Sequence, residues 1–230
     1  MGTDSSVFFV ANQVTASDVA DRTVLEVGSL DPRRAVRNVI LPLGPREYTG
    51  VDITPGPGVD KVCPAEALLD VFGPESVDVV VTTEMLEHVR DWRAVIHNLK
   101  GVLKTGGFLL ITTRSRGMEF HGYPLDFWRF EEHDMEEIFR DFHIDALERD
   151  WETPGVFLRA TRPGHFFEAD LSGHRLYSIV RRRRAASVTT FDVAGARLLV
   201  ASQKVTARVL PTPLRHQLRG VISRVAGSWA

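Results

Sequence analysis

Two short apolar runs constrain the fold of this chain most. The first, Val24–Val27, is followed directly by Gly28-Ser29, and the second, Glu47–Val51, is followed by Asp52. A continuous run of Val and Leu is typical of a strand buried on both faces of a parallel sheet. A glycine after such a strand lets the backbone approach a ligand, and an acid after the next strand can accept hydrogen bonds from a ribose. The pattern therefore predicts the first βαβ unit of a nucleotide-binding fold.

The carboxylate of Glu26, at the end of the first run, indicates which kind of nucleotide binds. A negative charge beside the first turn would repel a pyrophosphate. S-adenosylmethionine carries no phosphate, and its sulfonium and ammonium groups are both cationic. The sequence therefore favours S-adenosylmethionine over a dinucleotide.

Composition limits the class of protein. Hydrophobic residues make up 43% of the 230 residues and charged residues 25%, which is typical of a soluble globular domain. Cys63 is the only cysteine, so an intramolecular disulfide and a cage built of cysteines alone are excluded. No apolar run reaches the roughly 20 residues of a membrane span, and the start of the chain lacks a basic signal-peptide head. We therefore expect a cytoplasmic protein.

Strands and helices alternate along the first two thirds of the chain. Further strands are predicted at Val77–Thr82 and Gly107–Thr112, and amphipathic helices at Arg33–Leu41 and Asp91–Leu103. An acidic helix, Glu131–Asp141, precedes a closing antiparallel pair of strands. These segments are Phe142–Leu147 and Gly155–Thr161. Such alternation predicts an α/β fold with a doubly wound, mostly parallel sheet, in which ligands bind beyond the carboxyl ends of the strands.

Charge divides the chain at residue 163. Residues 1–163 carry 17 basic and 27 acidic side chains, whereas residues 164–230 carry 11 basic and 3 acidic ones. We expect a domain over 1–163 and a basic C-terminal extension over 164–230, with an arginine run at Arg181–Arg184. The extension also contains a predicted strand, Ala196–Ser202, and an amphipathic helix, Leu214–Ala226. It could pack on the acidic body, form a homodimer surface or contact a membrane peripherally; nucleic acid is less favoured.

Four segments in order resemble the class I S-adenosylmethionine-dependent methyltransferases, over roughly residues 20–162. They are Glu26-Val-Gly-Ser, the acid Asp52, the segment Asp78–Val89 and the turn Leu103–Leu110. One departure is Leu30, which stands where the family has a second glycine. The resemblance implies a seven-stranded Rossmann-like sheet and S-adenosylmethionine as cofactor. The cofactor-binding residues that it implies are Glu26, Gly28, Ser29, Asp52, Ala65, Glu66 and Thr83.

Glu84-x-x-Glu87-His88 is the first of two segments that bear on chemistry. On a helix beginning near Glu84, these three side chains share one face, and their donor atoms suit Mg²⁺ or Mn²⁺. The pattern is similar to that of metal-dependent O-methyltransferases of ubiquinone synthesis and of small-RNA 2′-O-methylation, which implies a metal site, with Glu84 and His88 also acting in catalysis. The alternative is structural: His88 packs under a loop and Glu87 caps a helix.

The second segment is the polar and aromatic loop that follows the fourth strand. We expect His121 to act as a general base or as a further metal ligand, because its intrinsic pKa suits proton removal at neutral pH. The loop's candidate substrate-binding residues are Tyr123, Asp126, Trp128 and Arg129. Similar segments occur in bacterial methyltransferases of polysaccharide synthesis. The alternative is that the aromatic residues belong to the core and that Arg129 pairs with Asp126.

Together these features predict an O-methyltransferase that acts on a sugar hydroxyl in glycan or polysaccharide biosynthesis, with a small-molecule or oligosaccharide acceptor. Two alternatives remain open. One is an O-methyltransferase of a phenolic or quinone metabolite. The other is an inactive cofactor-binding scaffold whose tail binds a membrane or a partner.

Overall fold

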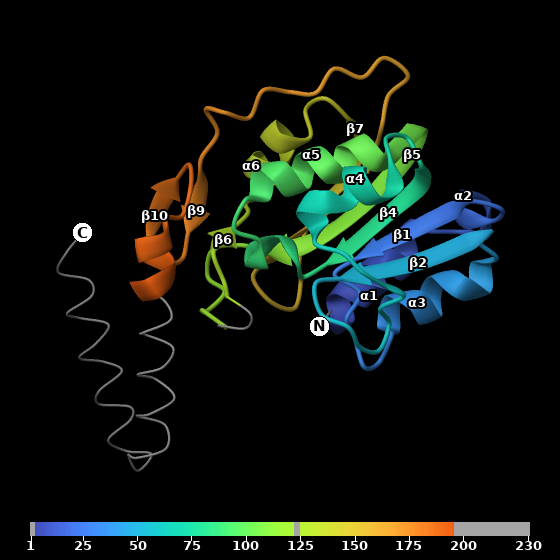
Figure 1. Cartoon of the computed structure of the whole chain (residues 1–230), viewed down its shortest axis with the longest axis horizontal. Helices are drawn as coiled ribbons and strands as arrows, with labels where there is room; N and C mark the ends of the chain where they lie inside the picture. The colour runs from blue at the N-terminus through green and yellow to red at the C-terminus, as the bar shows by residue number, and fades with distance from the viewer. Residues whose placement is uncertain (1–2, 122–124, 196–230) are drawn as a thin grey trace, which may run out of the picture. The chain divides into compact units, whose positions relative to one another are not determined.

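A seven-stranded sheet forms the centre of the protein (Figure 1). The computed structural model describes residues 3–121 and 125–195. The strands run in the order β3-β2-β1-β4-β5-β8-β7; the first five are parallel, and β8 is antiparallel to β5 and β7. Their bounds are β1 Thr23–Val27, β2 Glu47–Asp52, β3 Lys61–Val62, β4 Val77–Thr83, β5 Leu103–Arg114, β7 His143–Arg149 and β8 Gly155–Thr161. The predicted Rossmann-like sheet and its antiparallel closing pair are confirmed.

Helices cover both faces of this sheet (Figure 1). The α-helices are α1 Asp4–Gln13, α2 Ala16–Val19, α3 Ala35–Ile40, α4 Leu68–Phe72, α5 Trp92–Val102 and α6 Glu132–Ile138, and the 3₁₀ helices are η1 Leu41–Leu43, η2 Ala65–Ala67 and η3 Leu86–His88. Phe9 and Ile40, from α1 and α3, pack on one face against Val79 and Val81 of β4. Helices α4, α5 and α6 lie over the opposite face. Helix α5 begins one residue later than predicted because Asp91 is its N-cap and accepts a hydrogen bond from Ala94 N–H.

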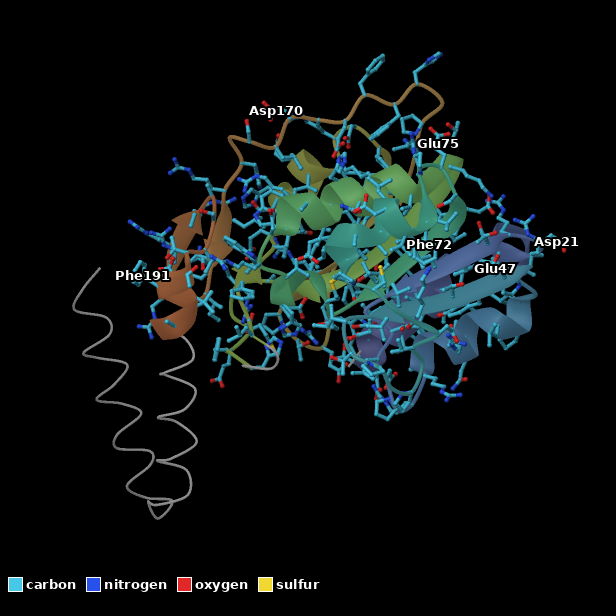
Figure 2. All side chains as sticks on the ribbon, in the orientation of Figure 1. Asp21, Glu47, Phe72, Glu75, Asp170 and Phe191 are labelled. Atoms are coloured by element: carbon cyan, nitrogen blue, oxygen red, sulfur yellow. The ribbon has the colours of Figure 1, made fainter. Side chains whose placement is uncertain are left out.

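The two ends of the parallel strands have different roles. Asp21, Glu47 and Glu75 lie at or near the amino ends of β1, β2 and β4 (Figure 2). Gly28, which follows β1, and Asp52, which ends β2, mark the opposite edge. The predicted cofactor residues therefore lie along one edge of the sheet, as expected for a doubly wound fold.

A second, smaller sheet has no counterpart in the sequence predictions. It contains β6 Trp128–Arg129, β9 Leu176–Ser178 and β10 Arg183–Ala185 in the order β10-β9-β6, with both pairings antiparallel. Residues 164–187 belong to the same compact unit as the large sheet. This unit ends at Ser187, past the domain boundary predicted at residue 163. A second unit begins at Val188. The strand and helix predicted after residue 195 lie outside the described residues.

The segment between β8 and β9 is held to the domain by hydrogen bonds, and Asp170 marks its course in Figure 2. Ala169 N–H donates to Asp141, and the Arg93 guanidinium donates to the carbonyls of Leu171 and His174. These bonds bring β9 back to the domain. In the part of the chain that the structure describes, no helix has the length and apolar character needed to cross a bilayer.

Candidate functional site

Gly28 turns the chain directly after β1. Its φ is +82°, in the left-handed region that favours glycine, and a Cβ at this position would lie 2.9 Å from the side chain of Met85. The N–H groups of Gly28 and Ser29 both donate to the Val51 carbonyl, at 2.9 and 3.0 Å. The loop after β1 is therefore fixed between β2 on one side and the residues after β4 on the other.

Asp52 stabilises the same loop from the end of β2. One carboxylate oxygen accepts from Leu30 N–H at 3.3 Å and the other from Thr54 N–H at 3.0 Å. Leu30, the departure from the family pattern, thus contributes its backbone and not its side chain to this contact. The side chain of Ile53 beside Asp52 is 60% exposed, which is unusual for an isoleucine next to a polar site. Ile53 is not among the residues that the sequence predicts for the site, and its only sequence signal is an apolar residue inside a polar turn.

Glu26 is buried beneath the loop and lies 2.7 Å from Tyr48, whose hydroxyl donates to it. Burial raises the pKa of Glu26 to about 7, and the hydrogen bond from Tyr48 opposes that shift. A buried carboxyl group with a pKa near neutrality is poised to interact with a cation. The position fits the role that the family resemblance implies for Glu26.

The other predicted cofactor residues occupy two places on this edge. Thr83 is buried at the carboxyl end of β4. Ala65 is buried and Glu66 exposed in η2, which follows β3, and Cys63 N–H donates to the Asp52 carbonyl at 2.9 Å. The structure therefore brings the η2 segment to the end of β2.

Glu84 does not lie on a helix with Glu87 and His88, so the predicted i, i+3, i+4 arrangement is wrong. Its φ is +55°, and only a single 3₁₀ turn, η3, follows. The carboxylate is buried and accepts hydrogen bonds from Ser6 and Thr112, at 3.0 and 2.9 Å.

Arg114 contacts the same Glu84 carboxylate and also lies 3.3 Å from Asp150. Burial and the neighbouring Glu87 carboxyl raise the pKa of Glu84, whereas Arg114 lowers it. Both carboxylate oxygens of Glu84 thus have partners, and Glu84 is absent from the group of side chains that could hold a metal ion. Its predicted catalytic role has no free carboxylate oxygen in this structure. The sequence does not reveal Arg114 and Ser6 as partners of Glu84, because they are far from it along the chain.

Glu87, His88 and His121 do come together. One ligand atom from each side chain lies within 4.8 Å of the other two. The two Nε2 atoms are 3.1 Å apart, and Glu87 Oε1 is 3.7 Å from His88 Nε2 and 3.9 Å from His121 Nε2. The second Glu87 oxygen accepts from the Thr113 hydroxyl at 2.9 Å, whereas Oε1 is buried without a hydrogen-bond partner in the described structure.

The Nδ1 atoms of both imidazoles point away from this cluster and are hydrogen-bonded to other oxygen atoms. His88 Nδ1 lies 2.8 Å from the Leu125 carbonyl, which can only accept, so Nδ1 carries the proton and Nε2 keeps a lone pair. His121 Nδ1 lies 3.0 Å from Asp126 in the same way. Burial lowers the pKa of His88, whereas the hydrogen bond to Asp126 raises that of His121. Three electron-pair donors therefore converge on one point.

Asp126, Trp128 and Arg129 build the loop that carries His121. Arg129 is buried, and its guanidinium donates to both Asp126 oxygens and to the carbonyls of Met118 and Glu119. These bonds outweigh the effect of burial and lower the pKa of Asp126 to about 2.

Trp128 is also buried, and its Nε1–H donates to the Val89 carbonyl at 3.0 Å. Trp128 and Arg129 thus present no free polar group to a substrate. The alternative given by the sequence, in which the aromatic residue belongs to the core and Arg129 pairs with Asp126, describes them. Tyr123 lies outside the described residues.

Comparison of the chain with known proteins indicates a methyltransferase. A family model described as a methyltransferase domain matches residues 11–156. The ubiquinone biosynthesis O-methyltransferase of Parvibaculum lavamentivorans is 31% identical over 70 residues, and this match covers 30% of the chain but 27% of that relative.

Two solved structures share the fold. A Haloferax volcanii complex between a methyltransferase activator and a methyltransferase aligns with a TM-score of 0.57 at 16% identity, over 71% of this chain and 91% of that one. The Burkholderia thailandensis 1,6-didemethyltoxoflavin N1-methyltransferase, with bound S-adenosylhomocysteine, aligns with a TM-score of 0.55 at 16% identity, over 69% and 78%.

The fold and the glycine loop define an S-adenosylmethionine-dependent methyltransferase of class I. The chain belongs to the methyltransferase domain family, whose model covers more than half of its length.

Proposed function

We propose that this methyltransferase transfers the methyl group to a hydroxyl oxygen. The observation that carries the proposal is the position of the Glu87–His88–His121 cluster. A Cβ at Gly28 would lie 2.9 Å from the Met85 side chain, so Met85 borders the loop after β1, and Glu87 follows Met85 by two residues. A hydroxyl held by the cluster would therefore lie close to the cofactor, so the oxygen could attack the sulfonium methyl in line while the protein supplies orientation and proximity.

The positions of the residues at the carboxyl ends of the strands support the following cofactor-binding roles. The carboxylate of Asp52 would accept hydrogen bonds from the ribose hydroxyls, and Glu26 would interact with the ammonium group. Ile53 and Ala65 would contact the adenine ring, because one is an exposed apolar side chain and the other lies in η2 at the end of β2. The Gly28 backbone would lie against the methionine part.

The residues of the cluster fit a divalent cation. The buried Glu87 Oε1 has no hydrogen-bond partner among the described residues, and the Nε2 atoms of His88 and His121 lie 3.7 and 3.9 Å from it. A bound divalent cation would lower the pKa of the acceptor hydroxyl. With Glu84 engaged by Arg114, the donor set is two imidazoles and one carboxylate. This set favours Mn²⁺ or another transition metal over Mg²⁺, which prefers oxygen ligands.

A general base is the alternative role for His121. Asp126 fixes the tautomer of the imidazole, as a carboxylate does in hydrolase triads, and leaves Nε2 free to accept a proton. The two roles make opposite predictions for chelators, because the base needs no metal.

For the acceptor we propose a sugar hydroxyl. The exposed polar side chains of the loop that carries His121, among them Arg116 and Glu119, suit a hydroxylated substrate better than an apolar one. A phenolic or quinone acceptor is the second candidate, because the Parvibaculum relative is named for ubiquinone biosynthesis.

Titration calorimetry with S-adenosylhomocysteine tests the cofactor site. We expect micromolar binding to the wild type and loss of binding by Asp52→Ala. The matched control is Asp70→Ala, at an exposed aspartate of α4, which should bind normally. Methyl transfer to a panel of sugars and phenols, with and without Mn²⁺, then tests the reaction. No transfer to any hydroxyl by a protein that binds the cofactor would contradict the proposal.

A further inference from the structure

The two carboxylate oxygens of Glu87 have different surroundings. The side chain is fully buried, and Oε2 accepts a hydrogen bond from the Thr113 hydroxyl at 2.9 Å. Oε1 has no hydrogen-bond partner in the described part of the chain, and it lies within 4 Å of the Nε2 atoms of His88 and His121. A buried carboxylate oxygen without a partner is costly. The carboxylate is therefore oriented so that the protein binds one oxygen and leaves the other beside the two imidazoles.

Glu84 shows how this protein satisfies a buried carboxylate that has a structural role. Ser6 and Thr112 donate hydrogen bonds to its Oε1, and Arg114 contacts its Oε2. A structural Glu87 would have a partner for each oxygen in the same way. The single partner of Glu87 indicates that its second oxygen is left for a ligand.

Thr113 donates its hydrogen bond from a strand inside the large sheet. Strand β5 pairs with β4 on one side and with β8 on the other, and Thr113 lies opposite Val156 of β8. Pairing on both sides fixes the backbone, and branching at Cβ restricts the rotamers of the threonine side chain. The hydroxyl of Thr113 is therefore a donor with a fixed position.

The backbone around Glu87 is fixed by the chain that follows the His121 loop. Phe127 N–H donates to the Glu87 carbonyl at 2.8 Å, and His88 Nδ1 lies 2.8 Å from the Leu125 carbonyl. With the main chain held by these bonds and Oε2 held by Thr113, the carboxylate has little freedom to rotate.

Successive residues of β5 contact the two glutamates separately. Side chains alternate along a strand, so Thr112 and Arg114 share one face and Thr113 points to the other. Thr112 and Arg114 contact Glu84, whereas Thr113 contacts Glu87. The strand therefore treats the two carboxylates differently, and Thr112 and Thr113 form a matched pair for experiment.

We infer that Thr113 is a positioning residue whose hydroxyl holds Glu87 so that Oε1 alone is offered to a divalent cation. Since the cation is part of the proposed function, this role rests on that function and deepens it. Partners that hydrogen-bond a metal ligand orient it and strengthen metal binding. A carboxylate that binds through one oxygen also occupies one coordination position instead of two, which leaves room for the acceptor hydroxyl.

Calorimetric titration of the full-length protein with Mn²⁺ tests this role. Thr113→Val keeps the size of the side chain and removes the donor, so Mn²⁺ affinity should fall by about 10- to 100-fold. Thr113→Ser keeps a hydroxyl and should restore most of the affinity. The matched control is Thr112→Val, which removes a buried hydroxyl that donates to Glu84 at 2.9 Å. Thr112→Val and Thr113→Val should both unfold at lower urea concentration than the wild type, but Thr112→Val should bind Mn²⁺ normally.

Titration of the same four proteins with S-adenosylhomocysteine reads the cofactor site separately, and their affinities should be equal. A wild type that binds S-adenosylhomocysteine but no Mn²⁺ contradicts the metal-assisted reaction, and the role of Thr113 falls with it. Equal Mn²⁺ affinity in the wild type and Thr113→Val overturns the role of Thr113 alone.

Two further results would also overturn this role, because each would assign the effect to packing. They are Mn²⁺ binding by Thr113→Ser as weak as that by Thr113→Val, and an equal loss of affinity in Thr112→Val. If Thr113→Val does not fold, Thr113→Ala takes its place under the same criteria.

Discussion

His88 Nε2 and His121 Nε2 lie 3.1 Å apart, although η3 carries one residue and the loop after β5 carries the other. Both Nδ1 atoms are hydrogen-bonded to oxygen, at the Leu125 carbonyl and the Asp126 carboxylate. Two protonated imidazoles at this distance would repel each other. The arrangement is therefore stable with a proton shared by the two Nε2 atoms or with a metal cation between them. Chelation of the metal distinguishes the two cases.

The first prediction concerns metal dependence. Treatment with EDTA should abolish methyl transfer, and Mn²⁺ should restore it at lower concentration than Mg²⁺, because two of the three donors are imidazoles. His88→Ala should lose activity and Mn²⁺ binding together. His97→Ala, which changes an exposed histidine on α5, should lose neither. Full activity in EDTA would assign His121 to the general-base role.

The second prediction concerns Asp126. Asp126→Asn removes the negative charge beside His121 Nδ1, so the pKa of His121, raised in the wild type, should fall. Loss of such a partner typically costs about 10- to 100-fold in activity or metal affinity. The pKa is measured by NMR titration of the His121 ring, and turnover is measured alongside. An unchanged His121 pKa in a folded variant would contradict the assignment.

The third prediction separates steric contact from backbone strain in the cofactor loop. Gly28 and Gly44 have similar φ values, +82° and +79°, but an added Cβ would meet Met85 at Gly28 and nothing within 4 Å at Gly44. Both alanine variants should lose about 1 kcal/mol or more of stability from strain. Only Gly28→Ala should also lose affinity for S-adenosylhomocysteine, by about tenfold or more in calorimetry. Equal affinities in the two variants would place the cofactor elsewhere.

The fourth prediction concerns pH and Glu26. Its pKa is about 7 in the folded protein, against an ordinary value of 4.5. Between these values the unfolded chain releases its proton first. The free energy of unfolding should therefore fall as pH rises from 4.5 to 7, by about 3 kcal/mol at most, and level off above 7. Glu26→Gln should remove this part of the slope and be the more stable protein above pH 7. Urea unfolding of both proteins at several pH values measures the difference.

The fifth prediction concerns the buried ion pair. Arg114→Met leaves the Glu84 carboxylate buried without its cation, which should cost about 3–5 kcal/mol in the free energy of unfolding. The control Arg149→Met breaks an ion pair at an arginine side chain that is 80% exposed, and it should cost far less. Equal losses would show that Glu84 does not depend on Arg114.

Local signals account for the parts of the fold that could be predicted. Buried strands such as β4 are continuous apolar runs, the amphipathic α5 has a clear helical period, and Asp91 is a strong N-cap. The small sheet could not be predicted in this way, because strands of two or three residues are too short to show a period. Its pairing of Trp128 with Ser178 joins positions 50 residues apart in the sequence.

The candidate site was predicted only in part for a related reason. Gly28, Asp52, Glu87, His88 and His121 were named because each residue type suits its chemistry, and the structure brings the last three together. The sequence predicts Glu84 beside them because its spacing fits a helix. Spacing alone could not reveal that Arg114 binds its carboxylate and that its backbone is left-handed.

The strand order has a consequence for how such a protein can change. Every residue proposed for the cofactor comes from β1, β2, β4 and the turns that follow β1, β2 and β3, whereas His121 comes from the chain after β5. The two groups meet mainly through the short stretch from Met85 to His88. The second half of the chain can thus vary its loops, and with them the acceptor, while the first half keeps the same methyl donor.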